Sequence, residues 1–133
     1  MYIGADPESG SQALYALADS GGEPRALEID LSGGVPRDLA WSPDGTRIAV
    51  STEPTDSTDG DVFLYDVASG ELTPLGLGPT NPSWSPDGRW LSFPKESGGT
   101  SQLWALKVDS GEAPVQLTHG PGSFFEAKWR PSP

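Results

Sequence analysis

The chain has 133 residues, of which 8 are Lys or Arg and 19 are Asp or Glu, so its net charge is −11. With 17 Gly, 14 Pro, five Trp and no Cys, it has room for one domain, and this composition excludes long helices, disulfides and an unfolded linker. The negative charge disfavours nucleic acid and anionic membranes as partners, and no apolar run is long enough for membrane insertion or a signal peptide.

A pentapeptide recurs along the chain. Residues 41–45 read Trp-Ser-Pro-Asp-Gly, residues 84–88 repeat them, and a third copy begins at Trp129 and then departs from the pattern. Proline presets φ early in a turn and glycine supplies the positive φ that ends it, so each full copy predicts a hairpin. A second landmark, Leu followed by an aromatic residue, precedes a Ser-Gly or Gly-Glu turn in each period. The period is about forty residues, typical of a repeat protein.

Short strands rich in aromatic and branched residues fill each period. They come in repeating groups of four: a first strand ending in Trp, a second after the hairpin, a third with the Leu-aromatic pair, and a short fourth. Four antiparallel strands at this period are typical of a β-propeller blade. In chain order the expected strands are 1–4, 14–17, 24–27, 38–41, 47–51, 62–66, 72–75, 81–84, 90–93, 103–106, 115–118 and 126–129.

These repeats resemble the WD-like repeats of TolB-type propellers. The similarity lies in the Trp-Ser-Pro-Asp-Gly hairpins, in Arg-Ile-Ala-Val at 47–50, in Val-Phe-Leu-Tyr-Asp at 62–66 and in 115–120, and it covers nearly the whole chain. The resemblance implies an all-β propeller fold. TolB is the periplasmic partner of the Tol-Pal envelope system, but similar repeats occur in the propellers of prolyl oligopeptidase-type serine peptidases and in scaffold proteins, so the likeness selects no single function.

The order of the expected strands does not start with the first strand of a blade. The chain opens in a second strand and closes in a first strand, so a single propeller domain, 1–133, holds about three blades. The expected blade pieces are 1–28, completed by 123–133, then 36–76 and 80–118.

Three blades do not close a ring, because propellers have four to eight. An open arc would also expose apolar faces and an unpaired strand edge. We therefore expect a homodimer in which each chain is half of a six-bladed ring. The strand with Ala127 and Trp129 would pair with the strand of the other chain that holds Tyr2 and Ile3. The alternative is that the sequence is a fragment of a longer propeller.

The sequence offers little catalytic chemistry. Its one His, His119, falls in the loop after a fourth strand, and no Gly-x-Ser-x-Gly motif is present, so we expect neither an enzyme nor a cofactor. Three carboxylates at 56–61 would suit calcium. Their spacing lacks the alternation and the distal Glu of a calcium loop, which favours a solvated loop without metal and leaves calcium open.

Binding is expected at the loops on one face, because the side chains of the strands are already used in packing. By the up-and-down strand order, this face carries the connections 5–11, 52–61 and 94–101 together with 29–37, 76–80 and 119–124. The acidic residues there predict a basic protein or peptide partner. The candidate contact residues are Glu53, Asp56, Asp59, Asp61, Phe124 and Phe125.

Two functions from different classes remain open. The first is a non-catalytic scaffold for protein–protein interaction. The second is a piece of the gating propeller of a prolyl oligopeptidase-type serine peptidase without its hydrolase domain. With no signal peptide, the chain as written is expected in the cytoplasm, or in the periplasm if it comes from an exported protein.

Overall fold

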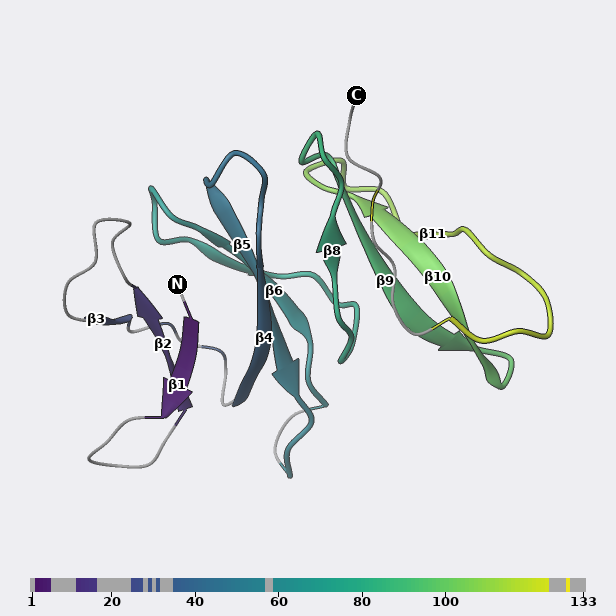
Figure 1. Cartoon of the computed structure of the whole chain (residues 1–133), viewed down its shortest axis with the longest axis horizontal. Helices are drawn as coiled ribbons and strands as arrows, with labels where there is room; N and C mark the ends of the chain where they lie inside the picture. The colour runs from purple at the N-terminus through teal and green to yellow at the C-terminus, as the bar shows by residue number, and fades with distance from the viewer. Residues whose placement is uncertain are drawn as a thin grey trace.

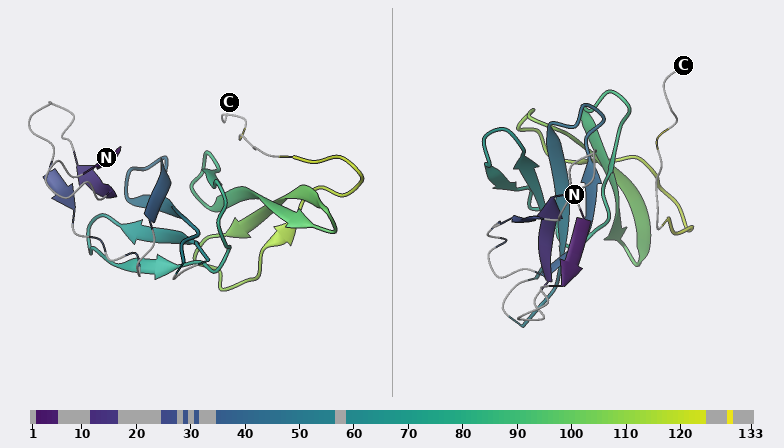
Figure 2. Two further views of the ribbon diagram at one scale, coloured as in Figure 1. Left: turned by 90° about the horizontal axis from the view of Figure 1, so that it is seen from below. Right: turned by 60° about the vertical axis from the view of Figure 1, so that its left-hand side comes forward.

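A computed structural model describes residues 2–5, 12–16, 25–27, 29, 31, 35–56, 59–124 and 129. Over these residues the chain is all-β and forms three antiparallel sheets that follow one another along the molecule (Figure 1; Figure 2). Within the described part, no helix is long and apolar enough to cross a membrane.

Each sheet corresponds to one blade, and its strands are hydrogen-bonded in chain order. The first sheet has three described strands, and the other two have four each. The first contains β1 (Tyr2–Ala5), β2 (Gln12–Ala16) and β3 (Arg25–Leu27). The second contains β4 (Val35–Trp41), β5 (Arg47–Glu53), β6 (Val62–Asp66) and β7 (Leu72–Pro74). The third contains β8 (Ser83–Trp84), β9 (Trp90–Ser97), β10 (Thr100–Lys107) and β11 (Val115–Gln116).

The predicted all-β propeller fold is confirmed, and the described strands agree with the expected order of one group of three followed by two groups of four. The expected strand 126–129 lies outside the described residues except for Trp129. One prediction was wrong: 94–101 is not a long loop. There β9 continues to Ser97 and β10 begins at Thr100, because Gly98 and Gly99 both adopt positive φ, 61° and 86°, which permits a two-residue hairpin turn.

The Ser-Pro-Asp-Gly hairpins form as expected. In each, the amide of the glycine donates to the serine carbonyl at 2.9 Å, and both glycines have φ of 72°. The aspartate then ties the turn together: Asp44 Oδ1 accepts from the hydroxyl of Ser42 at 2.7 Å and from the amide of Thr46 at 3.0 Å. These hydrogen bonds, that from the Ser42 hydroxyl first, lower the pKa of Asp44 to about 2.

The core lies between the sheets, on both faces of the second one. Alternate residues of β5 and β6 point to opposite sides, as a strand requires. Ile48 and Val50 belong to a cluster with Leu31, and Ala49 and Val62 belong to a cluster with residues of the third sheet, including Trp84, Leu91 and Phe93. A four-stranded sheet buried on both faces is the packing expected of a blade between two neighbours.

Candidate functional site

Two of the connections predicted to share one face, 52–61 and 76–80, are joined by Asp61; residues 6–11 and part of 29–37 lie outside the described residues. The Asp61 carboxylate accepts hydrogen bonds from the amides of Leu77 at 2.8 Å, Gly76 at 3.0 Å and Gly78 at 3.2 Å, besides that of Val62 at 2.8 Å. Because backbone amides from another loop surround this oxygen pair, the segment 52–61 and the segment 76–80 form one structural unit.

In the third blade, the side chain of Gln102 holds a connection in place. Its side chain is buried, and Nε2 donates to the carbonyl of Gly122 at 2.9 Å and to that of Gly120 at 3.2 Å. Its Oε1 accepts from the hydroxyl of Thr118 at 2.7 Å. Buried amide groups need such partners, so these bonds fix the connection 119–124 on the same face as 76–80.

A cleft of about 920 Å³ opens on this face, between the second and third sheets. Its lining includes Arg37, Thr80, Lys95, Glu96 and Ser123. Arg37 reaches it from a β-bulge, because the register of β4 against β5 shifts between Pro36 and Asp38, and a bulge re-aims the side chain of its extra residue. The volume is within the range of sites for small molecules or peptide side chains.

The cleft lining holds two cationic residues, Arg37 and Lys95, and one acidic residue, Glu96, whereas the described acidic residues of the neighbouring segment 52–61 are Glu53, Asp56, Asp59 and Asp61. Lys95 Nζ lies 5.3 Å from the ring centroid of Trp104, a cation–π contact. Within the described part of the chain, the ion pair joins Arg47 to Asp109 at 2.7 Å. Arg37 and Lys95 therefore have no ion-pair partner among the described residues. Arg37 and Lys95 were not predicted as site residues, since only the bulge and the packing of two blades bring them to one cleft.

The predicted acidic residues divide into two groups. Glu53, Asp56 and Asp59 are exposed, as residues available to a partner would be. Asp61 is half-buried and already accepts four backbone amides, so its carboxylate serves the loop structure. Among the residues that the structure describes, no group of three or more His, Asp or Glu side chains could hold a metal ion.

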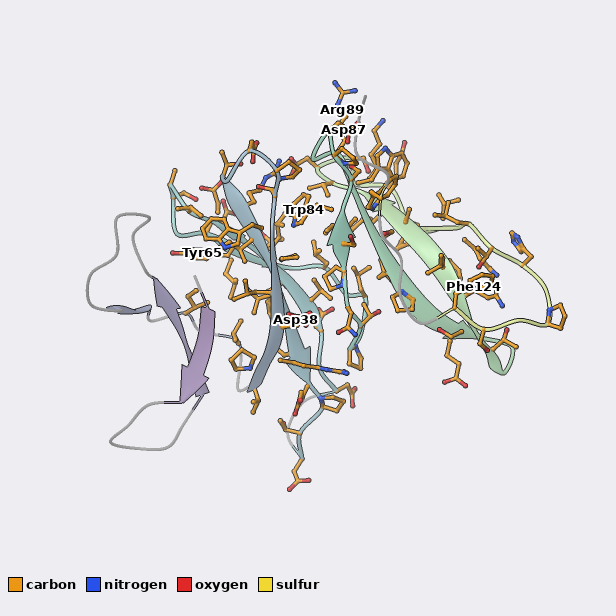
Figure 3. All side chains as sticks on the ribbon, viewed as in Figure 1. Asp38, Tyr65, Trp84, Asp87, Arg89 and Phe124 are labelled. Carbon is orange, nitrogen blue, oxygen red and sulfur yellow. The ribbon has the colours of Figure 1, made fainter. Side chains whose placement is uncertain are left out.

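The remaining predicted residues lie in the first sheet, in the connection 119–124 or outside the described residues. Phe124 is 41% exposed, and its amide donates to the carbonyl of Ser101 at 2.7 Å; Figure 3 shows it on the third-blade side of the molecule. Tyr2 and Ile3 lie on β1, opposite Tyr15 and Leu14 of β2. Phe125 and Ala127 lie outside the described residues, and the exposed His119 lies in the connection after β11.

Comparison with known proteins supports the propeller fold. No family model matches the chain. A TolB-like protein of Agrobacterium tumefaciens is 33% identical with a TM-score of 0.67, covering 90% of this chain and 42% of that chain. The TolB of Acinetobacter baumannii shares the fold at 22% identity, with a TM-score of 0.71 over 96% of this chain and 32% of that chain.

Curated relatives include both an uncharacterized protein and a peptidase. An uncharacterized protein of Agrobacterium fabrum is 31% identical over 129 residues, which cover 95% of this chain and 41% of the relative. The uncharacterized peptidase YuxL of Bacillus subtilis is 33% identical over 102 residues, 71% of this chain and 15% of the relative. The chain therefore spans less than half the length of these relatives and corresponds to part of a propeller.

Proposed function

We propose that the chain is a non-catalytic β-propeller module for protein–protein interaction, and that it assembles by strand exchange between chain ends. The observation that carries the proposal is the loop face. Asp61 and Gln102 fix its connections through buried or half-buried hydrogen bonds, and a cleft of about 920 Å³ opens among them. Loops held rigidly on a sheet scaffold are the usual place for recognition.

The charge of this face favours a basic protein or peptide as the partner. Glu53, Asp56 and Asp59 are exposed on one segment of it, and the chain as a whole carries a net charge of −11. A field of this sign steers cationic surfaces toward the loops and repels acidic ones. Arg37 and Lys95 in the neighbouring cleft would then bind a carboxylate of the same partner. A partner segment with both basic and acidic residues therefore fits this face better than a uniformly basic one.

The first sheet supports the proposed assembly by strand exchange. β1 pairs with β2, and no described strand pairs with its other edge. An open edge presents unpaired amides and carbonyls and is a template for another strand. In the proposed two-fold dimer, residues 1–28 of one copy are completed by 123–133 of the other, and the two chains form six blades.

The interaction is tested by measuring the Kd of an oligolysine peptide that ends in a free carboxylate. The double variant Glu53→Gln, Asp56→Asn should raise this Kd about three- to tenfold, given the usual strength of exposed charge pairs. The matched control, Glu71→Gln with Glu112→Gln, removes two exposed charges outside the candidate loops and should change the Kd less than twofold or so. Equal weakening by both pairs, or no binding by the wild type, would contradict the proposal.

A second candidate function rests on the peptidase relatives. Besides YuxL, the dipeptidyl-peptidase 5 of Porphyromonas gingivalis is 32% identical over 100 residues, 65% of this chain and 14% of the relative. In this alternative the chain is a piece of a propeller that gates a serine hydrolase domain. The neighbouring coding sequence distinguishes the two functions: a contiguous serine hydrolase sequence favours the gating propeller, and envelope genes favour the interaction module.

A further inference from the structure

The cleft between the second and third sheets holds cations that the described chain does not neutralise. Arg37 and Lys95 are both exposed and both line the cleft, and neither forms an ion pair with a described residue. The whole chain has 19 Asp or Glu for 8 Lys or Arg, so carboxylates are far more numerous than cations. Two unpaired cations gathered in one concave site of such an acidic chain indicate an anionic ligand.

An aromatic ring, and not a carboxylate, holds the side chain of Lys95. Its Nζ lies 5.3 Å from the ring centroid of the half-buried Trp104, which belongs to the neighbouring strand β10. A cation–π contact leaves N–H groups of the ammonium available to another acceptor. The acidic residue of the lining, Glu96, directly follows Lys95 in β9, and successive side chains of a strand point to opposite faces. Lys95 is therefore positioned at the cleft with its charge still available to a ligand.

The deeper part of the cleft offers apolar contact. Leu77 and Thr80 line it although they are only 6% and 7% exposed, so they form its floor, whereas the exposed Arg37 and Lys95 form its rim. The hydroxyl of Thr80 donates to the carbonyl of Pro94, so the hydrogen of this hydroxyl is already used. A ligand of this cleft would therefore meet positive charge at the rim and the Leu77 side chain at the floor.

A charged rim above an apolar floor selects one kind of anion. In an Asp or Glu side chain the carboxylate is the tip, and no apolar group extends beyond it. In the C-terminal residue of a peptide, the carboxylate and the side chain leave the same Cα, so the carboxylate can bind the rim while an apolar side chain reaches the floor. A phosphate dianion fits less well, because the net charge of −11 repels it more strongly than it repels a single carboxylate.

We propose that this cleft binds the C-terminal residue of a peptide, and that this residue has an apolar side chain. The carboxylate would accept hydrogen bonds from Arg37 and Lys95, and the apolar side chain would lie on Leu77. Basic residues earlier in the peptide would face the exposed carboxylates of the segment 52–61. The inference therefore rests on the function proposed above and assigns the end of the partner that enters the cleft. The cleft volume of about 920 Å³ is sufficient for such a chain end.

The test compares two peptides by isothermal titration calorimetry: acetyl-Lys-Lys-Lys-Leu with a free carboxylate, and the same peptide with a C-terminal amide. On the wild type, the Kd of the amide should be about 3- to 20-fold higher, given the usual strength of exposed charge pairs. The double variant Arg37→Gln, Lys95→Gln should bring this ratio to about one. The matched control, Arg89→Gln, removes an exposed cation just before β9, at the opposite end of that strand from Lys95 (Figure 3), and should leave the ratio unchanged. Because the ratio compares two peptides on one protein, a loss of folded protein does not alter it.

Two further measurements separate this inference from the proposed function. Replacing the terminal Leu of the free-acid peptide with Gly should raise its Kd about 3- to 10-fold, because the contact with the floor is lost. Inorganic phosphate should displace the peptide no better than sodium chloride at the same ionic strength. Equal Kd values for acid and amide, no effect of Gly, or specific displacement by phosphate would overturn the inference, and the interaction itself would stand if Glu53→Gln, Asp56→Asn still weakens binding. A wild type that binds neither peptide would overturn the proposed function as well.

Discussion

Replacing Asp61 with Asn should destabilise the chain through the connection between β7 and β8. Oδ1 of Asp61 accepts three amides and Oδ2 accepts the amide of Gly76. Asn keeps one acceptor oxygen, but it loses the charge and turns an NH₂ group toward the Gly76 amide. Hydrogen bonds to a charged group are worth about twice those to a neutral one. With discounting for the exposed Gly76 amide, the expected loss is about 2 kcal/mol.

Thermal and urea denaturation followed by circular dichroism at one protein concentration measure this loss. For a chain of this length, about 2 kcal/mol corresponds to a midpoint lower by about 7 °C. The matched control is Asp59→Asn in the same loop, because Asp59 is exposed and makes no hydrogen bond with the described residues. Its effect should stay within about 0.5 kcal/mol. Equal shifts in the two variants would refute the assignment of Asp61 to loop structure.

Two further predictions concern the turns. The pKa of Asp44, ordinarily 3.8, is lowered to about 2, chiefly by the hydrogen bond from the Ser42 hydroxyl. A carboxyl whose pKa is lower in the folded chain stabilises the fold at pH values above its unfolded-state pKa. That stabilisation is lost as the pH falls through the folded-state pKa. Asp44→Asn should therefore flatten the pH dependence of the urea midpoint between pH 4 and pH 2 (about the two pKa values), and an unchanged slope would contradict this. Gly60→Ala should lower the thermal midpoint more than Gly45→Ala: both have positive φ, but a Cβ at Gly60 would lie 2.8 Å from the carbonyl oxygen of Thr52 and one at Gly45 meets nothing within 4 Å. Equal midpoints would show that this backbone contact costs nothing.

The blades could be predicted because their signals are local. The Ser-Pro-Asp-Gly turn needs only neighbouring residues: Asp44 bonds to Ser42 and Thr46, and Gly45 takes the positive φ. The strand phase followed from the same repeats. The length of the β9–β10 hairpin was missed because Pro94 and two glycines read as a loop, whereas Pro94 pairs opposite Leu103 inside the sheet.

The candidate site was less predictable because its contacts are distant in sequence. Asp61 reads as one of several acidic loop residues, and only the fold brings the amides of 76–78 around it. Arg37 and Lys95 line one cleft because of a bulge and the packing of two blades, and neither is visible in a residue pattern. The exposure of Glu53, Asp56 and Asp59 does not depend on such distant contacts. It was therefore predictable from the sequence.

The molar mass in solution tests most directly whether two copies close one ring. Light scattering over a dilution series should give about 28 kDa, twice the chain mass of 14.0 kDa, falling toward the chain mass at low concentration. Deletion of residues 125–133, which removes Trp129, should give the single-chain mass throughout. A wild-type mass of 14.0 kDa at every concentration would contradict closure by a second copy.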